Sequence, residues 1–414
     1  MTLRTHLTFE YNQDDPPFDP IAVAKSLRPL LLAHAEQAEQ EGRIPQPVFD
    51  ALRTSGLLRM MVPKRVGGFG CNMITHLRTI AELAKGCAGT AWSFGLLSGC
   101  TGTAAGLPPE ISKTLFKTGE ELLCSVTSAV GKARPVPGGY RVSGRWGYGS
   151  GCMHADWAMN TVAVLDQNGD EVDRAFAIIP LKNSPEVHIE HTWKVLGVKG
   201  SGSNTVVAED VFLPENLIMR HSQMPTQAQL LTFPDLEARE RGPLEPVFPL
   251  GVLAPTLGAA EALLERVQEK MTQRSVVAWH YDRQSDSQIL VYQLGEAAME
   301  IDSAWLHIEK ATIFMDEVAP TRVITGYEKA LIQANCGYAM QQLRKAGERL
   351  MDIAGPGGFA DSNPLQRFWR DLSFASRHNY LNSRLSLELY GRARLGQPSN
   401  FELLEDIGDN ASSA

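Results

Sequence analysis

The sequence predicts an α+β protein that is mainly α-helical, with an N-terminal helical domain, a middle antiparallel β-domain and a C-terminal four-helix bundle. Three observations support this order. Apolar residues recur at helical spacing up to about residue 120, short β-rich segments then alternate with turns, and long helical patterns follow. We therefore expect domains over residues 1–120, 121–220 and 221–414.

Capping signals predict the helices of the first domain. Asp19 before Pro20 is a typical N-cap with a first-turn proline, and Gly42 is a stop signal. Pro29 is expected to divide the helix between them because proline has no backbone N–H. The predicted helices cover residues 20–41, 47–55, 73–85 and 88–105. The last has no charged residue, so we expect it to be a buried helix or the wall of an apolar pocket.

The second and third domains are predicted from the period of their apolar residues. Strands separated by Gly, Pro, Asn and Asp are expected over 122–128, 140–146, 157–165, 174–181, 187–193 and 205–212. So many short strands within about one hundred residues indicate a compact sandwich or barrel. Long helices are expected over 286–316, 327–353 and 365–395, and they indicate an antiparallel bundle.

Composition limits the possible functions. The chain has 414 residues, of which 43% are hydrophobic and 21% charged, as is ordinary for a globular protein. A net charge of −8 disfavours a nucleic-acid partner or an anionic membrane surface. There is no signal-peptide pattern and no apolar run of about 18 residues, so we expect a cytoplasmic protein. The cysteines and histidines are dispersed, so we expect no metal site and no disulfide.

The stretch from Gly144 to Trp157 is the candidate centre of the protein. Gly147, Gly149 and Gly151 have no Cβ, so the backbone there can lie flat against a broad ligand. Ser150 supplies one hydroxyl among several aromatic rings, which would suit a flat aromatic ligand with a ring N–H. The alternative is a glycine-kinked strand at the corner of a barrel.

Together with two further segments, this stretch resembles the acyl-CoA dehydrogenase family. Residues 144–157 resemble the segment that seats the flavin ring, and 193–203 followed by 209–215 resemble the second β-domain signature. Arg274 falls where the family has an arginine against the flavin phosphates. The resemblance runs from about residue 44 to residue 395 and implies the acyl-CoA dehydrogenase fold.

The resemblance is greatest to one branch of that family. In many dehydrogenases a catalytic glutamate follows an Arg-Asp pair in the last long helix, whereas here Arg370-Asp371 is followed by His378-Asn379. That pattern resembles the oxygenase components of two-component flavin monooxygenases. These include the 4-hydroxyphenylacetate and steroid-phenol hydroxylases and the dibenzothiophene monooxygenases. The branch uses diffusible reduced FMN or FAD from a separate NAD(P)H-flavin reductase. With O2 it forms a C4a-hydroperoxyflavin that oxygenates an aromatic substrate, and the family habit implies a homotetramer.

The resemblance also implies site residues. Ser150 would accept a hydrogen bond from flavin N5–H, and His378 would be a base or hydrogen-bond partner for the substrate. The expected flavin-binding residues are Trp146, Tyr148, Gly149, Ser150, Gly151, Ser201, Ser203, Arg274, Gly357 and Gly358. The expected substrate-pocket residues are Trp92, Cys100, Ser125, His378 and Tyr380. No metal ligand is expected.

One position departs from the family pattern. Cys100 stands where the 4-hydroxyphenylacetate hydroxylases have a substrate-contacting histidine. A thiol is smaller and a weaker donor, so a larger or less polar aromatic is expected, such as a polycyclic phenol, an indole or a thiophene.

Two alternative functions stay open at this point. The chain could be an acyl-CoA dehydrogenase or oxidase with tightly bound FAD, or a helical scaffold that has lost the flavin.

The loop from Gly355 to Ala360 follows a long helix, so a helix stop is favoured over a phosphate cradle. In the family, the corresponding loop carries a flavin tail across a subunit interface.

Overall fold

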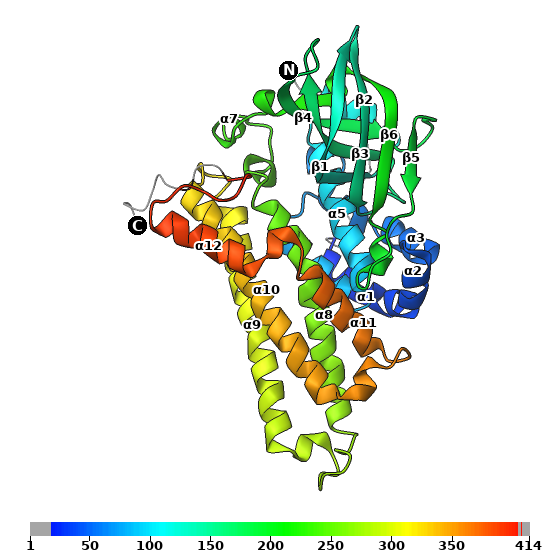
Figure 1. Ribbon diagram of the computed structural model, residues 1–414, viewed down its shortest axis with the longest axis vertical. Coiled ribbons are helices and arrows are strands. Elements are labelled where there is room, and N and C mark those ends of the chain that lie inside the picture. Colours follow the sequence, from blue (N-terminus) through cyan, green and yellow to red (C-terminus); the bar gives the residue numbers. More distant parts are fainter. Residues whose placement is uncertain (1–17, 405–406, 408–414) are drawn as a thin grey trace.

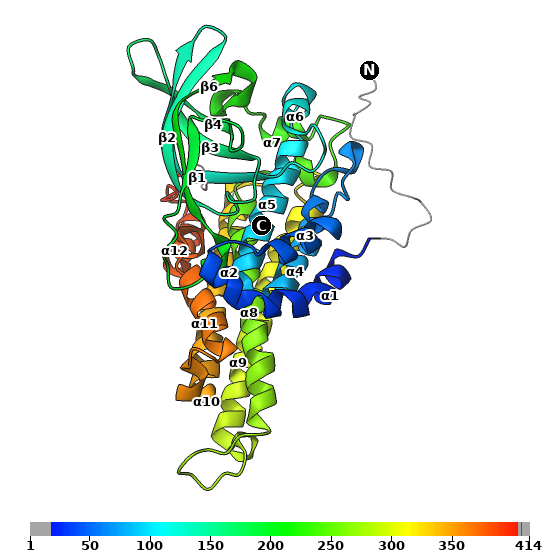
Figure 2. The ribbon, with the colours of Figure 1, turned by 90° about the vertical axis from the view of Figure 1, so that its right-hand side faces the viewer.

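The computed structural model describes residues 18–404 and residue 407. Figures 1 and 2 show a β-sheet at one end, N-terminal helices beside it, and long helices that extend to the other end. Helix α5 (Ala88–Ala105) lies where these three parts meet. It contacts α4 (Met73–Ala84), α8 (Val247–Met271), strand β1 (Leu123–Val136) and the short 3-10 helix η3 (Lys199–Ser201).

The N-terminal helices follow their capping residues. They are α1 (Pro20–Ala33), α2 (Ala35–Glu41), α3 (Gln46–Thr54), α4, α5 and α6 (Pro109–Leu115). The Asp19 carboxylate accepts hydrogen bonds from two N–H groups of the first turn of α1, at 3.0 and 3.1 Å. The predicted break at Pro29 is wrong, because α1 continues through this proline and ends before His34. Only one intrahelical bond is lost at Pro29, and the packing of α1 against α4 stabilises the helix.

The middle of the chain forms a seven-stranded sheet in the order β5-β6-β2-β1-β3-β4-β7. The strands after β1 are β2 (Gly139–Gly149), β3 (Trp157–Leu165), β4 (Glu171–Pro180), β5 (Val187–Glu190), β6 (Asn204–Pro214) and β7 (Ile218–Arg220). All pairings are antiparallel except that between β1 and β3, which is parallel. The register of β1 against β3 shifts between Val126 and Gly131, so β1 bulges at this point.

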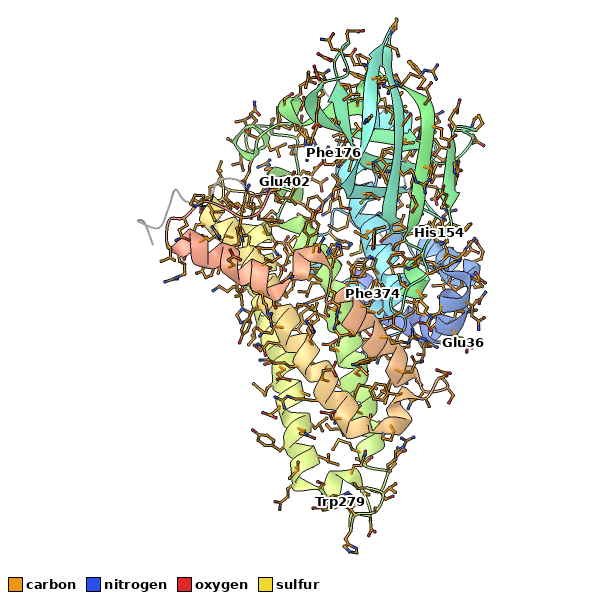
Figure 3. All side chains as sticks on the ribbon, viewed as in Figure 1. Glu36, His154, Phe176, Trp279, Phe374 and Glu402 are labelled. Carbon is orange, nitrogen blue, oxygen red and sulfur yellow. The ribbon has the colours of Figure 1, made fainter. Side chains whose placement is uncertain are left out.

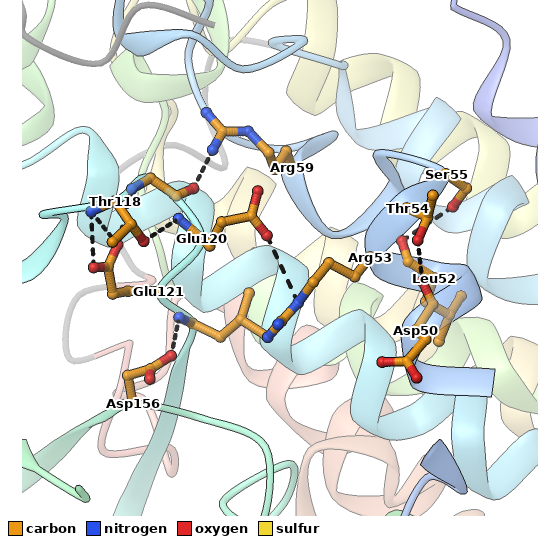
Figure 4. A network of polar contacts seen from close by, with 12 residues as sticks. Asp50, Leu52, Arg53, Thr54, Ser55, Arg59, Thr118, Glu120, Glu121 and Asp156 are labelled. Atoms are coloured by element: carbon orange, nitrogen blue, oxygen red, sulfur yellow. Dashed lines mark hydrogen bonds and ion pairs between the residues drawn. The ribbon is translucent and has the colours of Figure 1, made fainter. Parts of the chain in front are cut away.

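A polar network fixes the point where the chain enters the sheet (Figure 4). The Glu121 carboxylate accepts hydrogen bonds of 2.9–3.2 Å from the backbone N–H groups of residues 117–119. Asp156, just before β3, accepts the N–H of Leu122 at 2.9 Å. Backbone donors of the linker are thereby satisfied, and β1 starts beside β3.

The C-terminal part is a helical bundle. Its helices are α8, α9 (Gln288–Glu317), α10 (Gly326–Ala354), α11 (Pro364–Ala375) and α12 (Ser383–Arg394), after the short α7 (Gln227–Leu230). Among the described residues, α8 is the one helix long and apolar enough to cross a membrane. However, 72% of its most apolar stretch is buried inside the protein, which is the pattern of a core helix.

The helix predicted over 365–395 is broken in two. Residues 376–382 leave the helix, and the Asn382 side chain caps α12 by accepting two backbone N–H groups at 3.1 and 3.2 Å. The break is held from the neighbouring helix, because Gln333 of α10 donates to the carbonyl of Tyr380 at 2.7 Å. This break turns His378 out of the bundle toward the sheet side, beside Trp92.

Candidate active site

Segments that are far apart in the sequence meet around the hydroxyl of Ser150. Trp92 of α5 donates its indole N–H to Ser150 Oγ at 3.1 Å, and Ser203 Oγ lies 2.7 Å from the same oxygen. The rings of Trp92 and His378 lie 5.8 Å apart, centroid to centroid. Ser150 and Ser203 are only 5% and 2% exposed, so these hydroxyls are shielded from bulk water.

One face of α5 is open although the helix is otherwise buried. Leu96, Gly99, Cys100 and Thr103 are partly exposed, and their helical spacing places them on the same face as Trp92. Burial raises the pKa of the Cys100 thiol to about 12, so this group stays neutral and weakly polar. The face of α5 next to Trp92 is therefore uncharged and partly exposed.

The backbone that carries Ser150 leaves β2 in a strained turn. Tyr148 has a φ of 64°, which is unusual for a bulky residue, and its carbonyl accepts the N–H of Ser150 at 2.9 Å. Gly151 has a φ of 81°, and a Cβ there would come within 2.7 Å of Leu97. The Tyr148 ring is 71% exposed and meets the edge of Trp193 at 5.6 Å. The strained turn therefore leaves the Tyr148 ring exposed, with Trp193 as its neighbour.

Helix α11 holds the loop that carries Ser201 and Ser203. Val198 in this loop has a φ of 46°, a genuine outlier for a β-branched residue, and Asp371 accepts its N–H at 2.6 Å. Arg370 donates to a carbonyl of the same loop at 2.5 Å. Burial raises the pKa of Asp371 to about 7. The Arg370-Asp371 pair therefore anchors the serine loop. It is not part of the cluster of Trp92, Ser150, Ser203 and His378, which we call the chamber.

His378 is oriented by its own backbone. Its Nδ1 accepts the N–H of Tyr380 at 3.3 Å, and the Tyr380 hydroxyl lies 3.3 Å from Thr127 Oγ1 on β1. Burial lowers the pKa of His378 to about 4, so the ring is neutral near pH 7. A neutral imidazole that accepts at Nδ1 carries its hydrogen on Nε2. The free edge of His378 is therefore a hydrogen-bond donor.

Two predicted site residues, Trp146 and Ser125, use their side-chain hydrogens within the sheet. Trp146 is fully buried, and its indole N–H donates to the carbonyl of Thr161 at 2.9 Å. Its ring fills the space above Gly131 and Gly144, where a Cβ would approach it to 2.3 and 2.6 Å. The Trp146 ring is therefore part of the core of the sheet, and a contact of this residue with the flavin stays a prediction. Ser125 donates its hydroxyl to the carbonyl of Met159 at 2.6 Å, so its hydrogen is used within the sheet.

Arg274 and Gly357 lie together but away from Ser150. A Cβ on Gly357 would stand 3.7 Å from Arg274 Nη1, and Gly358 is buried against Ala354. Arg274 belongs to the connection from α8 to α9, at the foot of the bundle, where Trp279 is labelled in Figure 3. Phe374, labelled near the middle of the same figure, packs on Trp193 and marks the level of the chamber.

His76 lies beside Ser98 and Gly99 of α5 and was not singled out from the sequence. Its Nε2 lies 2.8 Å from Ser98 Oγ, and its Cε1 would lie 3.6 Å from a Cβ on Gly99. Burial lowers the pKa of His76 to about 3. A polar ring on the apolar face of the predicted helix 73–85 is the signal that could have identified this residue.

The side chains that meet at Ser150 are uncharged and hold a few polar atoms in place, whereas the hollow beside Trp193 has charged residues in its lining. A Cβ on Gly147 would meet only Thr205 Oγ1 within 4 Å, so the backbone beside Tyr148 is open. A hollow of about 290 Å³ lies next to Trp193 and is lined by Glu39, Gly42, Lys194, Val195 and Lys199. In the part of the chain that the structure describes, no three His, Cys, Asp or Glu side chains cluster as metal ligands do. Such a surface suits a planar ring system with a ring N–H.

The chain is similar to flavoproteins along most of its length. Residues 22–106 match the model "Acyl-CoA dehydrogenase, N-terminal domain", and residues 250–383 match "Acyl-CoA dehydrogenase, C-terminal domain". The chain is 27% identical over 384 residues to the flavin-dependent monooxygenase, oxygenase subunit HsaA, of Rhodococcus jostii, covering 90% of this chain and 97% of that protein. It is 28% identical over 396 residues to the FADH(2)-dependent resorcinol hydroxylase, oxygenase component, of Rhizobium sp., covering 89% and 91%. The solved structure of XiaF from Streptomyces sp., in complex with FADH2 and glycerol, matches with a TM-score of 0.88 and 29% identity, covering 92% and 96%.

Proposed function

The chain belongs to the acyl-CoA dehydrogenase family, as an oxygenase component of the two-component flavin-dependent monooxygenases, and we propose that it oxygenates its aromatic substrate in the chamber around Ser150. Reduced flavin, FMN or FAD, supplies the chemistry when bound, because it reacts with O2 and provides the transferred oxygen atom. The reduced flavin comes from a separate flavin reductase.

The residues around Ser150 fit a flavin ring. The exposed Tyr148 ring and the open backbone at Gly147 leave room for a planar group on one side. The Ser150 hydroxyl is buried and can accept a hydrogen bond from the ring N–H at N5. The low exposure of Ser150 and Ser203 keeps water from this atom, which protects a reactive group from side reactions.

One observation carries the assignment: the chamber holds a neutral imidazole where a dehydrogenase of this family needs a carboxylate base. His378 lies against Trp92, and the next carboxylate along the chain is Glu388. Glu388 is exposed on α12 and pairs with Arg392 at 2.9 Å, so it does not point into the site. Proton abstraction from an acyl thioester is therefore disfavoured, and oxygen transfer is favoured.

Each remaining residue of the chamber has a role that follows from its contacts. His378 Nε2–H donates a hydrogen bond to the substrate and orients it, since Nδ1 is occupied by the N–H of Tyr380. Trp92 forms an aromatic wall. Leu96 and Cys100 continue this wall as apolar or weakly polar surface, so a large aromatic of low polarity fits better than a small charged phenol.

We also propose that the protein works as a cytoplasmic homotetramer. Tyr292, Met299, Leu306 and Ile313 are exposed on α9 and follow one another at intervals of seven residues, so they form one apolar stripe. A row of exposed apolar side chains along α9 supports a contact between subunits. Arg274 and Gly357, which lie far from Ser150 within one chain, would then meet the tail of a flavin held by a neighbouring subunit.

A product screen tests the function. The purified protein is mixed with chemically reduced flavin, O2 and a panel of phenols, indoles and thiophenes, with acyl-CoA thioesters as the matched negative panel. The protein should purify without yellow colour and should oxygenate at least one aromatic compound. A yellow protein that dehydrogenates an acyl-CoA in the same screen would contradict the assignment.

A further inference from the structure

The hydroxyl of Ser150 belongs to a row of three serines whose hydrogens can point either way. Ser150 Oγ and Ser203 Oγ are 2.7 Å apart, and so are Ser203 Oγ and Ser201 Oγ. In both pairs either oxygen can be the donor. All three serines are buried, with no more than 5% exposed. Trp92 is different, because its indole N–H can only donate.

The direction of the hydrogen bond between Ser150 and Ser203 determines whether Ser150 can accept a hydrogen bond from a ligand or donate one to it. A hydroxyl has one hydrogen and two lone pairs, and Trp92 occupies one lone pair of Ser150. If Ser150 donates to Ser203, its second lone pair is free to accept from the ligand. If Ser203 donates to Ser150 instead, both lone pairs are used, and the Ser150 hydrogen points to the ligand.

We propose that Ser203 is a positioning residue that lets Ser150 exchange these two roles, so that the site satisfies both redox states of the flavin. Reduced flavin presents an N–H at N5, which needs an acceptor, whereas oxidised flavin presents a lone pair, which needs a donor. An oxygenase component must take up the first state and release the second. Rotation of the hydroxyls along Ser150, Ser203 and Ser201 meets both demands without moving the backbone. This inference rests on the proposed function.

Removal of the Ser203 hydroxyl should affect the two redox states unequally. In Ser203→Ala with reduced flavin, Ser150 accepts from N5–H and its own hydrogen has no acceptor in a buried site. With oxidised flavin, the Ser150 hydrogen still donates to N5, so Ser150 keeps a partner for its hydrogen. The contact between Ser201 and Ser203 is lost in both redox states and does not change their ratio. An unpaired buried donor weakens binding by roughly tenfold or more, so the affinity for reduced flavin should fall by about this factor. The affinity for oxidised flavin should change by less than about twofold.

Anaerobic equilibrium dialysis measures both affinities without turnover, with reduced and with oxidised FMN and FAD as probes. Ser203→Thr, which keeps the hydroxyl, should restore the wild-type ratio of the two affinities. Trp92→Phe removes a donor that serves both redox states and should weaken both equally. If Ser203→Ala is unstable in thermal melting, Ser201→Ala is the second variant, because it removes the next acceptor and should move the ratio in the same direction.

The outcomes separate two failures. Equal weakening of both redox states by Ser203→Ala, or no change in the ratio, would overturn the role of Ser203 and leave the proposed function standing. A wild-type protein that binds neither redox state would remove the flavin assignment itself.

Discussion

The two ring nitrogens of His378 have separate tasks, and two substitutions can separate them. Nδ1 accepts the N–H of Tyr380 at 3.3 Å at the break between α11 and α12, whereas we propose that Nε2–H donates to the substrate. In His378→Asn, the amide oxygen can still accept that N–H as in an Asx turn, but the ε edge is lost. In His378→Gln, the longer side chain returns an N–H donor near the ε position but loses the local contact.

The structure sets the expected magnitudes. The Nδ1 contact is long and partly exposed, so its loss in His378→Gln should lower stability by about 0.5–1 kcal/mol. The ε-edge donor is one neutral hydrogen bond to the substrate, so its loss in His378→Asn should lower oxygen transfer by roughly tenfold. A general base would be worth about 10² to 10⁴ instead. Burial lowers the pKa of His378 to about 4, which makes the ring a weak base. The tenfold effect of one lost hydrogen bond is therefore favoured over the larger effect of a lost base.

The assay is the ratio of oxygenated product to hydrogen peroxide per reduced flavin consumed, together with thermal melting of each variant. His378→Asn should melt like the wild type and lose product to peroxide, whereas His378→Gln should keep most of its product and melt at a lower temperature. The reverse pattern would refute the assignment of the two edges. A loss of product by a factor of about 10³ or more in both variants would show that the ring acts as a base.

Three further predictions test the surroundings of the chamber. Ser150→Ala should still bind flavin but release severalfold more peroxide per product, because about 1 kcal/mol of hydrogen bonding at N5 is lost; an unchanged ratio would remove Ser150 from the mechanism. Burial raises the pKa of Asp371 to about 7, so the folded state holds this proton more tightly than the unfolded chain, and its contribution to stability is lost as pH rises through about 7. Asp371→Asn keeps an acceptor for Val198, so its Tm should exceed that of the wild type by an amount that grows from about pH 5 to about pH 8, and a constant difference would contradict this. Leu306→Glu should reduce the mass measured by light scattering, whereas the matched exposed change Val172→Glu on β4 should not.

Local signals predicted most of the elements because they act over a few residues. The uncharged run of α5 was predicted over residues 88–105, which are its bounds, and the Asp19 cap was predicted as the structure has it. The break between α11 and α12 was missed although Asn382 caps the second helix. Apolar spacing continued on both sides of this segment, and only the contact from Gln333 on α10 shows why the chain leaves the helix.

The chamber was harder to predict because its contacts depend on tertiary packing. Ser150 and Trp92 were singled out, but their hydrogen bond joins a strand end to a helix 58 positions earlier in the chain. Trp146 and Tyr148 are aromatic residues in the same glycine-containing stretch. The Trp146 ring is buried because Gly131 and Gly144, on two strands, leave space for it. The role of Asp371 could not be seen either, because its partner Val198 lies 173 positions earlier in the chain.

The central claim is that the chamber transfers one oxygen atom from O2 to an aromatic ring at the expense of reduced flavin. Isotope labelling tests it most directly: the protein, chemically reduced flavin and an aromatic compound from the screen are mixed under ¹⁸O2, and the product mass is measured. Each product molecule should contain one ¹⁸O atom, and none when the water is labelled instead. A product that takes its oxygen from water, or that gains no oxygen at all, would contradict it.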